Sequence, residues 1–371
     1  MKKSAILVAL MAALAGCSKE DSVVKIGHVA PLTGNIAHLG KDNENGARLA
    51  IDDANAAGVT IGGHKVTFEL VGEDDQADPK TGNIVAQRLV DAGVKGVVGH
   101  LNSGTTIPAS RIYDAAGIPM ISPSATNPKL TQAGLKGVFR TIANDVQQGS
   151  VMGAYAANKL GKKVAIIDDR TAYGQGLADE VEKGVKGAGG EVVAREFTSN
   201  QATDFMAILT KIKATNPEVI VYAGMDAQGG PMLKQVKQLG IDAKWITGDG
   251  GCTPEIIKLA GDSISDKTYC TQPGLPPDQM QGGKDFKERY KAKYGTEVQI
   301  YAPYAYDAAK AIIEAMKKAD STDPAKYLPE LKKITFKGVT ADVAFDDKGD
   351  IKNGAVTVYQ YDNGNWKALA N

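Results

Sequence analysis

The chain has 371 residues, a length typical of two or three domains. Hydrophobic residues make up 43% of it and charged residues 23%, as in an ordinary globular protein. Its 43 basic residues equal its 43 acidic residues, which argues against a nucleic-acid-binding protein because such proteins carry a basic excess. After residue 16, no apolar run reaches the roughly 18 residues that a membrane-spanning helix needs.

The N-terminal segment, residues 1–16, has the pattern of an export signal. Two lysines precede an apolar run over residues 5–15, which is too short to span a bilayer as a helix. The segment ends in Leu14-Ala15-Gly16-Cys17, which resembles the lipobox of bacterial lipoproteins. That resemblance implies cleavage before Cys17, a lipid on Cys17 and a periplasmic or cell-envelope location, with membrane contact only through this anchor. A plain signal peptide with an unrelated cysteine is the alternative.

The two other cysteines, Cys252 and Cys270, are 18 residues apart. Because an exported protein meets an oxidising environment, we expect a disulfide between them, worth about 3 kcal/mol for a loop of that length. Two buried free thiols are the alternative. The histidines are scattered without the spacing of metal ligands, so no metal site is predicted; they are His28, His38, His64 and His100.

The first part of the chain alternates strand and helix patterns. Apolar residues recur with helical spacing over residues 41–57, and Gly58 marks the end of that helix. Asp78-Pro79 opens the next helix, with proline at its first position. A third helix is predicted over residues 106–116. Strands are predicted over residues 24–31, 65–71, 94–99, 119–122 and 138–141. This repetition favours a parallel sheet covered by helices on both faces.

The alternation of strand and helix patterns then begins again, which predicts a second unit of the same kind. The strands expected in it are residues 163–168, 191–197, 219–223 and 244–247. The helices expected around them are residues 145–160, 174–188, 205–215 and 227–239. Three more helices follow over residues 285–294, 304–319 and 324–334. The pattern then changes to antiparallel strands over 340–345 and 355–361, joined by a turn. No linker separates the two units, so we expect closely packed lobes.

Polar loops follow the predicted strands of both units. In open α/β sheets, ligands bind beyond the carboxyl ends of the strands, so a cleft between the two units is the natural site. The loops are residues 100–106, 122–128, 169–174, 224–226 and 248–251. Each has a purely structural alternative, because Ser and Thr commonly cap helices and an Asp among glycines is common in turns.

Catalytic signals are weak throughout the chain. It has no G-x-S-x-G, H-E-x-x-H or Walker motif. Gly174-Gln-Gly176 follows a predicted strand but lacks the third glycine of the dinucleotide fingerprint. The sequence therefore predicts neither an enzyme nor a bound cofactor.

Several segments, in this order along the chain, are similar to one family. They are residues 24–34 (VKIGHVAPLTG), 45–55 (NGARLAIDDAN), 74–79 (DDQADP), 96–110 (GVVGHLNSGTTIPAS), 118–128 (IPMISPSATNP), 139–149 (FRTIANDVQQG), 173–178 (YGQGLA) and 346–350 (DDKGD). Over residues 23–365 the chain resembles the leucine/isoleucine/valine-binding proteins of ABC importers, in the type I periplasmic binding protein class. The resemblance implies two doubly wound parallel-sheet lobes joined by a hinge of three crossings. One lobe would hold residues 23–144 and 273–352, and the other residues 145–272 and 353–371.

The resemblance also implies an amino-acid site. Ser103 would bind the ligand carboxylate, and the loop Ser124-Ala125-Thr126 would offer the Ser124 carbonyl to the ammonium group and the Thr126 hydroxyl and N–H to the ligand. Asp249 would pair with the ammonium group, and Tyr173 would cover the ligand from the second lobe. Charge-assisted bonds of this kind are worth about 1.5–3 kcal/mol each.

Departures from the family pattern affect the side-chain pocket. Leu39 and Met225 stand where the branched-chain binder has tyrosines, and Gln299 stands, in a loose alignment, where it has phenylalanine. Ala77 and Asn102 replace the cysteines of the family's first-lobe disulfide.

We therefore expect a receptor that captures Leu, Ile or Val and delivers it to an ABC permease. Another small amino acid, an amide or a carboxylate is the alternative ligand. A sensory module of the same fold and an exported α/β enzyme are the alternative functions.

Overall fold

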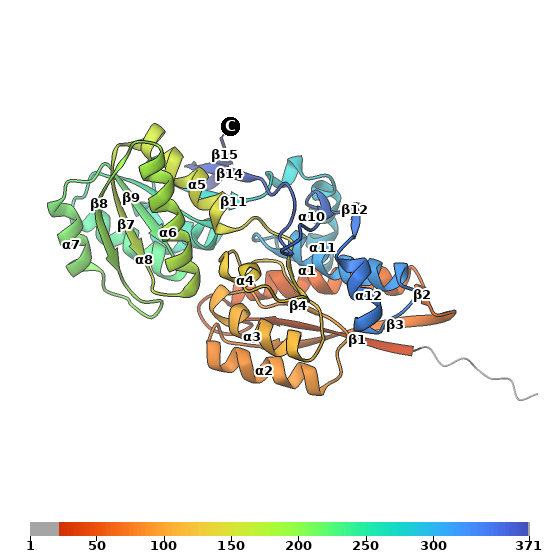
Figure 1. Ribbon diagram of the computed structural model, residues 1–371. Helices are drawn as coiled ribbons and strands as arrows, with labels where there is room; N and C mark the ends of the chain where they lie inside the picture. The colour runs from red at the N-terminus through yellow and green to blue at the C-terminus, as the bar shows by residue number, and fades with distance from the viewer. Residues whose placement is uncertain (1–21, 370–371) are drawn as a thin grey trace, which may run out of the picture.

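The computed structural model describes residues 22–369, which form two α/β lobes lying side by side (Figure 1). Each lobe is built on its own sheet. The sequence predictions about the export signal and Cys17 lie outside the described residues. Within residues 22–369, no helix combines the length and the apolar character needed to cross a membrane.

Lobe 1 is the body around a six-stranded sheet with the order β2-β3-β1-β4-β5-β6. Neighbouring strands are parallel except at the β2 edge. The strands are β1 (Ser22–Ala30), β2 (Thr60–Ile61), β3 (His64–Asp74), β4 (Val97–Gly99), β5 (Met120–Ser122) and β6 (Val138–Arg140). The predicted parallel sheet is confirmed, and the short antiparallel strand β2 is an addition that the sequence pattern did not predict.

Helices cover both faces of this sheet, and three of them come from the C-terminal third of the chain. They are α1 (Ala37–Ala56), α2 (Pro79–Asp91), α3 (Ser103–Ala115), α4 (Lys129–Gln132), α10 (Gly283–Tyr294), α11 (Ala302–Lys318) and α12 (Pro324–Leu331). Helix α11 packs on α1 and β4, so the light-blue C-terminal helices lie beside the red and orange N-terminal elements in Figure 1. A small antiparallel ladder of β12 (Thr335–Lys337) and β13 (Asp342–Ala344) follows.

Lobe 2 is the body around a seven-stranded sheet with the order β15-β14-β11-β10-β9-β7-β8. The strands are β7 (Lys163–Asp168), β8 (Glu191–Phe197), β9 (Val219–Ala223), β10 (Lys244–Thr247), β11 (Thr268–Pro273), β14 (Val356–Asp362) and β15 (Asn365–Ala368). The first five run parallel to one another, whereas β14 is antiparallel to both β11 and β15. The helices are α5 (Asp145–Tyr155), α6 (Ala172–Gly187), α7 (Met206–Ala214), α8 (Asp226–Gln238) and α9 (Pro254–Ala260).

The chain passes between the lobes three times, after β6, after β11 and after β13. This arrangement corrects one sequence prediction. Residues 340–345 and 355–361 do not pair with each other as strands of one hairpin. Instead β13 pairs with β12, and β14 returns to lobe 2, where it pairs with β11 and β15. The expected fold class, two doubly wound lobes with a hinge of three crossings, is confirmed.

Local signals explain where several helices begin. Asp78 caps α2 by accepting from the Thr81 N–H, as its Asp-Pro pair predicts. Helix α1 starts four residues before its predicted start, because Gly40 lets its first turn pass close to the Pro31 carbonyl. A Cβ atom at Gly40 would collide with that carbonyl oxygen, so this glycine inside a helix has a packing reason.

Candidate functional site

A cleft of about 570 Å³ lies between the lobes. Lobe 1 contributes residues 33–36, Gln76, Ala77, Pro79, Asn102 and Gly104 to its wall, and lobe 2 contributes residues 169–173, Asn200, Gln201, Met225, Ala227 and Gln228. These residues come from the loops after β1, β3, β4, β7, β8 and β9 and from the first turns of the helices α2, α3, α6 and α8. The predicted position of the site, beyond the carboxyl ends of the strands and between the lobes, agrees with this cleft.

A small cavity lies directly behind the cleft. Asn102, Tyr173 and Met225 line both spaces, so they form the boundary between them. The cavity is lined by Leu101, Asn102, Ser103, Ser124, Tyr173, Met225, Asp249 and Tyr301. Five of the eight residues predicted from sequence are thus brought together here; they are Ser103, Ser124, Tyr173, Met225 and Asp249.

Asp249 is the only acidic residue among the cavity-lining residues, and its exposed fraction is 1%. The Tyr173 hydroxyl donates to its Oδ1 at 2.8 Å, and the Tyr301 hydroxyl donates to its Oδ2 at 2.7 Å. Burial raises the pKa of Asp249, and the two hydroxyl donors offset this in part. An ionised carboxylate accepts about four hydrogen bonds, so these two tyrosines leave acceptor capacity for a ligand.

The loop that carries Asp249 needs its glycines. A Cβ atom at Gly248 would lie 2.7 Å from the Tyr173 hydroxyl, and one at Gly250 would lie 2.7 Å from the Met225 sulfur. The Gly250 N–H also donates to the Tyr173 hydroxyl at 3.1 Å. The turn among glycines, which the sequence left open as a purely structural feature, therefore brings the carboxylate against the cavity.

The start of helix α3 forms another part of the cavity wall. Ser103 is its first residue, and the N-cap residue Asn102 makes no capping side-chain hydrogen bond. Asn102 Oδ1 is buried without a partner. The N–H groups of a first helical turn have no acceptor within the helix and carry partial positive charge, which favours an anion. The Ser103 hydroxyl accepts from the Asn127 N–H at 3.3 Å, which fixes it beside the 122–128 loop.

Three predicted residues are buried near the cavity but are not among its lining residues. Leu39 belongs to the same hydrophobic cluster as Tyr173, Met225 and Tyr301. Thr126 is fully buried, and its hydroxyl has no hydrogen-bond partner. The Ala125 carbonyl accepts from Arg140 at 2.6 Å, and its N–H donates to the Ser122 hydroxyl at 2.9 Å. Ala125 therefore serves to hold the loop.

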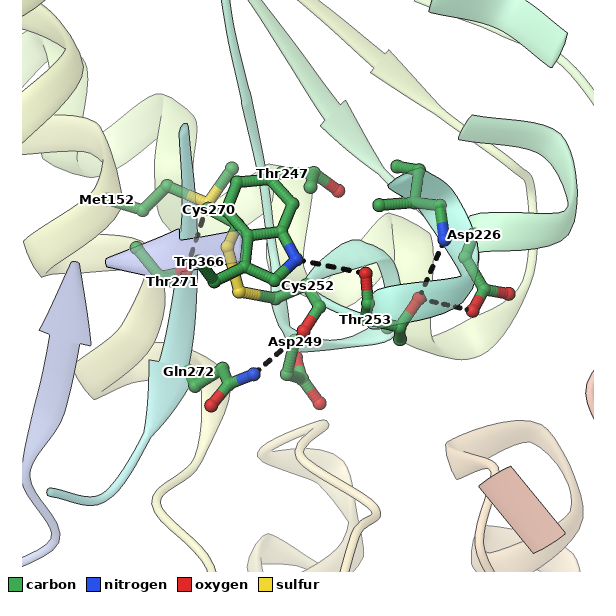
Figure 2. The surroundings of a disulfide bond; sticks show 12 residues. Met152, Asp226, Thr247, Asp249, Cys252, Thr253, Cys270, Thr271, Gln272 and Trp366 are labelled. Atoms are coloured by element: carbon green, nitrogen blue, oxygen red, sulfur yellow. Dashed lines mark hydrogen bonds between the residues drawn. A yellow bond between two sulfur atoms is a disulfide. The ribbon is translucent and has the colours of Figure 1, made fainter. Parts of the chain in front are cut away.

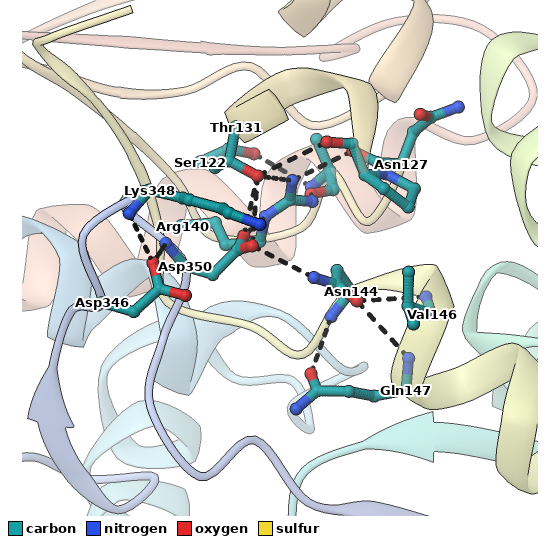
Figure 3. A network of polar contacts seen from close by, with 12 residues as sticks. Ser122, Asn127, Thr131, Arg140, Asn144, Val146, Gln147, Asp346, Lys348 and Asp350 are labelled. Carbon is teal, nitrogen blue, oxygen red and sulfur yellow. Dashed lines mark hydrogen bonds and ion pairs between the residues drawn. The ribbon is translucent and has the colours of Figure 1, made fainter. Parts of the chain in front are cut away.

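A buried arginine organises that loop. The guanidinium of Arg140 is fully buried and donates to the carbonyl oxygens of Ala125 and Asn127, and to Asp350 Oδ1 at 2.5 Å (Figure 3). Asp350, on the third chain passage, also accepts from Asn144, the N-cap of α5. The network thus joins the 122–128 loop to two of the chain segments that connect the lobes.

Sequence reasoning missed Tyr301. The four consecutive N–H groups of residues 299–302 all donate to the buried Asp42 carboxylate at 2.7–3.0 Å, which anchors the start of α11 and points the Tyr301 hydroxyl at Asp249. Gln299, the loosely aligned position, is not among the cavity-lining residues. Pro303, the second residue of α11, was the available signal, because proline is favoured in the first turn of a helix and so places Tyr301 close to the helix start.

The Asp249 loop continues into Cys252, whose sulfur lies at bonding distance from that of Cys270 on β11, with the two Cα atoms 5.3 Å apart. Both cysteines are fully buried, and Trp366 packs over them (Figure 2). The Trp366 indole N–H donates to the Thr253 carbonyl at 2.9 Å, and the Gln272 amide donates to the Cys252 carbonyl at 2.7 Å. These contacts tie the loop after Asp249 to the lobe 2 sheet.

Comparisons with known proteins identify the family of the chain. The family model described as periplasmic binding protein matches residues 23–365. The chain is 36% identical over 365 residues to the Leu/Ile/Val-binding protein homolog 1 of Brucella suis, covering 97% of this chain and 96% of that protein. It is 37% identical over 352 residues to the leucine-, isoleucine-, valine-, threonine- and alanine-binding protein of Pseudomonas aeruginosa, covering 95% and 93%.

Solved structures show the same relationship. A leucine binding protein of Thermotoga maritima superposes with a TM-score of 0.86 at 29% identity, covering 94% of this chain and 98% of that one. A branched-chain amino acid transporter substrate-binding protein of Streptococcus pneumoniae, solved with isoleucine, gives a TM-score of 0.84 at 31% identity, covering 94% and 99%. The resemblance expected from the motifs is confirmed. The chain belongs to the periplasmic binding protein family, a family of extracytoplasmic solute-binding receptors rather than enzymes.

Proposed function

We propose that the protein captures a free amino acid, with Leu, Ile or Val preferred, and delivers it to the membrane subunits of an ABC importer. The observation that carries this proposal is that Asp249 and the start of α3 line the same small buried cavity. A zwitterionic amino acid presents an ammonium group and a carboxylate a short distance apart. A buried carboxylate and an uncapped helix start match these two charges.

The roles of the individual residues follow from this match. Asp249 would accept from the ammonium group, with Tyr173 and Tyr301 holding its two oxygens in place. The Ser103 hydroxyl and the N–H groups of the first turn of α3 would bind the carboxylate. The Thr126 hydroxyl is buried and has no hydrogen-bond partner, so a small shift of its loop would allow it to hydrogen-bond to the ligand. Ser124 lines the cavity and would supply its carbonyl oxygen.

The remaining wall supports an aliphatic side chain. Leu101 and Met225 line the cavity, and Leu39 packs in the cluster that also holds Met225. Apolar walls favour an apolar side chain at roughly 25 cal/mol per Å² buried. The names of the relatives are consistent with this preference, and the Pseudomonas aeruginosa relative is also named for threonine and alanine.

Ligand capture would use the hinge. We take the lobe boundaries as residues 23–144 with 273–352, and 145–272 with 353–371. Asp249 and Tyr301 lie in different lobes, so their contact exists only when the lobes are closed. A ligand that contacts both lobes favours the closed state by the free energy of those added contacts. The closed form would be the one that the permease recognises.

Two covalent features complete the proposal. A lipid on Cys17 would hold the receptor at the membrane surface, and replacement of Cys17 by Ser should release the mature protein into the soluble cell-envelope fraction. A disulfide between Cys252 and Cys270 would stabilise the loop that carries Asp249, which their burial and separation support.

The melting temperature of refolded protein, residues 18–371, measured against each of the standard amino acids, tests the proposal. A selective ligand raises the melting temperature by mass action, by an amount that grows with its concentration relative to Kd. We expect increases with Leu, Ile and Val. An absence of any increase with all amino acids would overturn the proposed ligand class. Uptake of labelled leucine by cells that lack the protein then separates transport from sensing.

A further inference from the structure

An ion pair crosses between the lobes outside the ligand cavity. The His38 Nε2 atom, on helix α1 of lobe 1, lies 2.7 Å from Oδ2 of Asp226, the first residue of helix α8 in lobe 2. Neither residue lines the cavity or the cleft. The two residues are 188 positions apart in the chain. Because they belong to different lobes, the pair forms only when the two lobes approach each other.

Asp226 is a buried carboxylate held by contacts within lobe 2. Its carboxylate is fully buried and accepts from the Thr253 hydroxyl at 2.7 Å, a contact visible in Figure 2. It also lies in the first turn of α8, where the helix dipole favours negative charge. Its Oδ1 atom has no hydrogen-bond partner. His38 is therefore the cationic partner that the structure offers to this buried carboxylate.

Three acidic groups raise the pKa of His38. They are Asp226 of α8, Glu255 of α9 and Asp42 of its own helix α1. Burial lowers the pKa of His38, but the hydrogen bond and charge of Asp226 outweigh it, and the net pKa is raised above 6.5. The hydroxyls of Tyr222 and Tyr301 also lie in the field of Asp226, and they stay protonated at neutral pH.

We propose that His38 and Asp226 form a latch between the lobes, which holds the closed state when His38 is protonated and weakens when it loses its proton. The inference rests on the proposed closure around a ligand. Asp226 and Glu255 both belong to lobe 2, so lobe opening removes their effect on His38. A proton that binds more tightly in the closed state stabilises that state at pH values below the open-state pKa. This stabilisation is lost as the pH rises through the higher closed-state pKa.

The latch differs from two other polar contacts between the lobes. Tyr301 donates to Asp249 inside the cavity, and the Asn127 amide donates to the Ala172 carbonyl at 2.6 Å. Those donors are uncharged. Among these three contacts between described residues, only the His38 contact has a donor whose charge changes near neutral pH.

Variants at position 38 separate the effect of the His38 charge from the effect of its hydrogen bond to Asp226. His38→Gln keeps a donor that reaches Asp226 but carries no charge, and His38→Lys keeps the charge above pH 8. We would measure Kd for L-leucine by calorimetry at about pH 5.5 and about pH 8.5, where His38 changes charge. His38→Gln should bind about fivefold more weakly than wild type at the lower pH, and within about twofold of it at the higher pH. His38→Lys should bind more tightly than wild type at the higher pH.

The ratio of the His38→Gln Kd to the wild-type Kd is compared at the two pH values. An equal ratio at both would overturn the latch, since titration of other groups affects both proteins alike. Failure of wild type to bind L-leucine at any pH would instead count against the leucine assignment. Small-angle X-ray scattering of the ligand-free proteins then tests separately whether the latch holds the lobes closed. The radius of gyration of wild type should increase from the lower to the higher pH, while that of His38→Gln should not. An equal change in the two proteins would overturn the proposal.

Discussion

Tyr301 and Asp249 meet across the two lobes, with the Tyr301 hydroxyl donating to Oδ2 of Asp249 at 2.7 Å although 52 residues separate them in the chain. The other carboxylate oxygen accepts from Tyr173, which belongs to the same lobe as Asp249. Closure of the lobes therefore completes the set of hydroxyl donors around the one acidic group of the cavity. This contact links the position of the lobes to the orientation of the proposed ammonium acceptor.

Replacement of Tyr301 by Phe should weaken amino-acid binding about five- to tenfold, because one hydrogen bond to a charged group is lost while the ring still fills its place. Isothermal calorimetry measures the change. Tyr294→Phe is the matched control, because the Tyr294 hydroxyl donates to the Asn45 carbonyl within lobe 1. Equal loss of affinity in both variants would show that Tyr301 acts through general stability.

Replacement of Asp249 by Asn should reduce affinity by about 100-fold, because the ammonium group loses its charged acceptor. The same variant should leave the ligand-free protein as stable or more stable at pH 8. Burial raises the pKa of Asp249 above its unfolded value, so ionisation costs folding free energy as the pH rises. Combining it with Thr126→Ala should abolish binding with the fold intact by circular dichroism; undiminished affinity would falsify the site assignment.

Asp145 predicts a further pH dependence of stability. It is the first residue of α5, fully buried, and both its carboxylate oxygens lack hydrogen-bond partners. Burial raises its pKa to about 8, and the charge of Asp249 adds to the rise. The folded state thus binds a proton that the unfolded state releases near pH 4, and stability falls as the pH rises from there to about 8.

Asp145→Asn should therefore melt several degrees above wild type at about pH 8, and the difference should vanish near pH 4. Differential scanning calorimetry of ligand-free protein measures it. Asp262→Asn is the control, because its side chain is 91% exposed and its change should be small at both pH values. A pH-independent difference for Asp145→Asn would contradict the assigned titration.

Removal of the Cys252–Cys270 pair tests the proposed disulfide. Mature protein denatured without reductant should show no free thiol at either position. The double variant Cys252→Ser, Cys270→Ser should lose about 3 kcal/mol of unfolding free energy, as expected for a loop of this length. Urea titration measures that loss. Two labelled thiols in the wild-type protein would disprove the bond.

The strands of the parallel sheets could be predicted from sequence because their signal is local. Residues 163–168 and 219–223 are short apolar runs, as buried parallel strands are, and both form strands at those positions. The Asp-Pro pair at residues 78–79 likewise predicts the start of α2. Strand β11 was missed because its sequence, TYCTQP, mixes polar and apolar residues and has no clear period.

Contacts between distant residues could not be predicted in this way. Residue pattern alone did not place β14 in lobe 2, because that placement depends on pairing with β11, whose strand had no clear sequence signal. Only the family resemblance implied that residues 353–371 belong to lobe 2. Tyr301 reaches Asp249 because Asp42 anchors the start of α11, and His38 meets Asp226 because α1 and α8 lie in facing lobes. Residue pattern therefore specified most of the parallel strands and the family of this chain. The donors around Asp249 and the His38 contact arose only from packing, since burial and charge partners depend on which surfaces the folded lobes bring together.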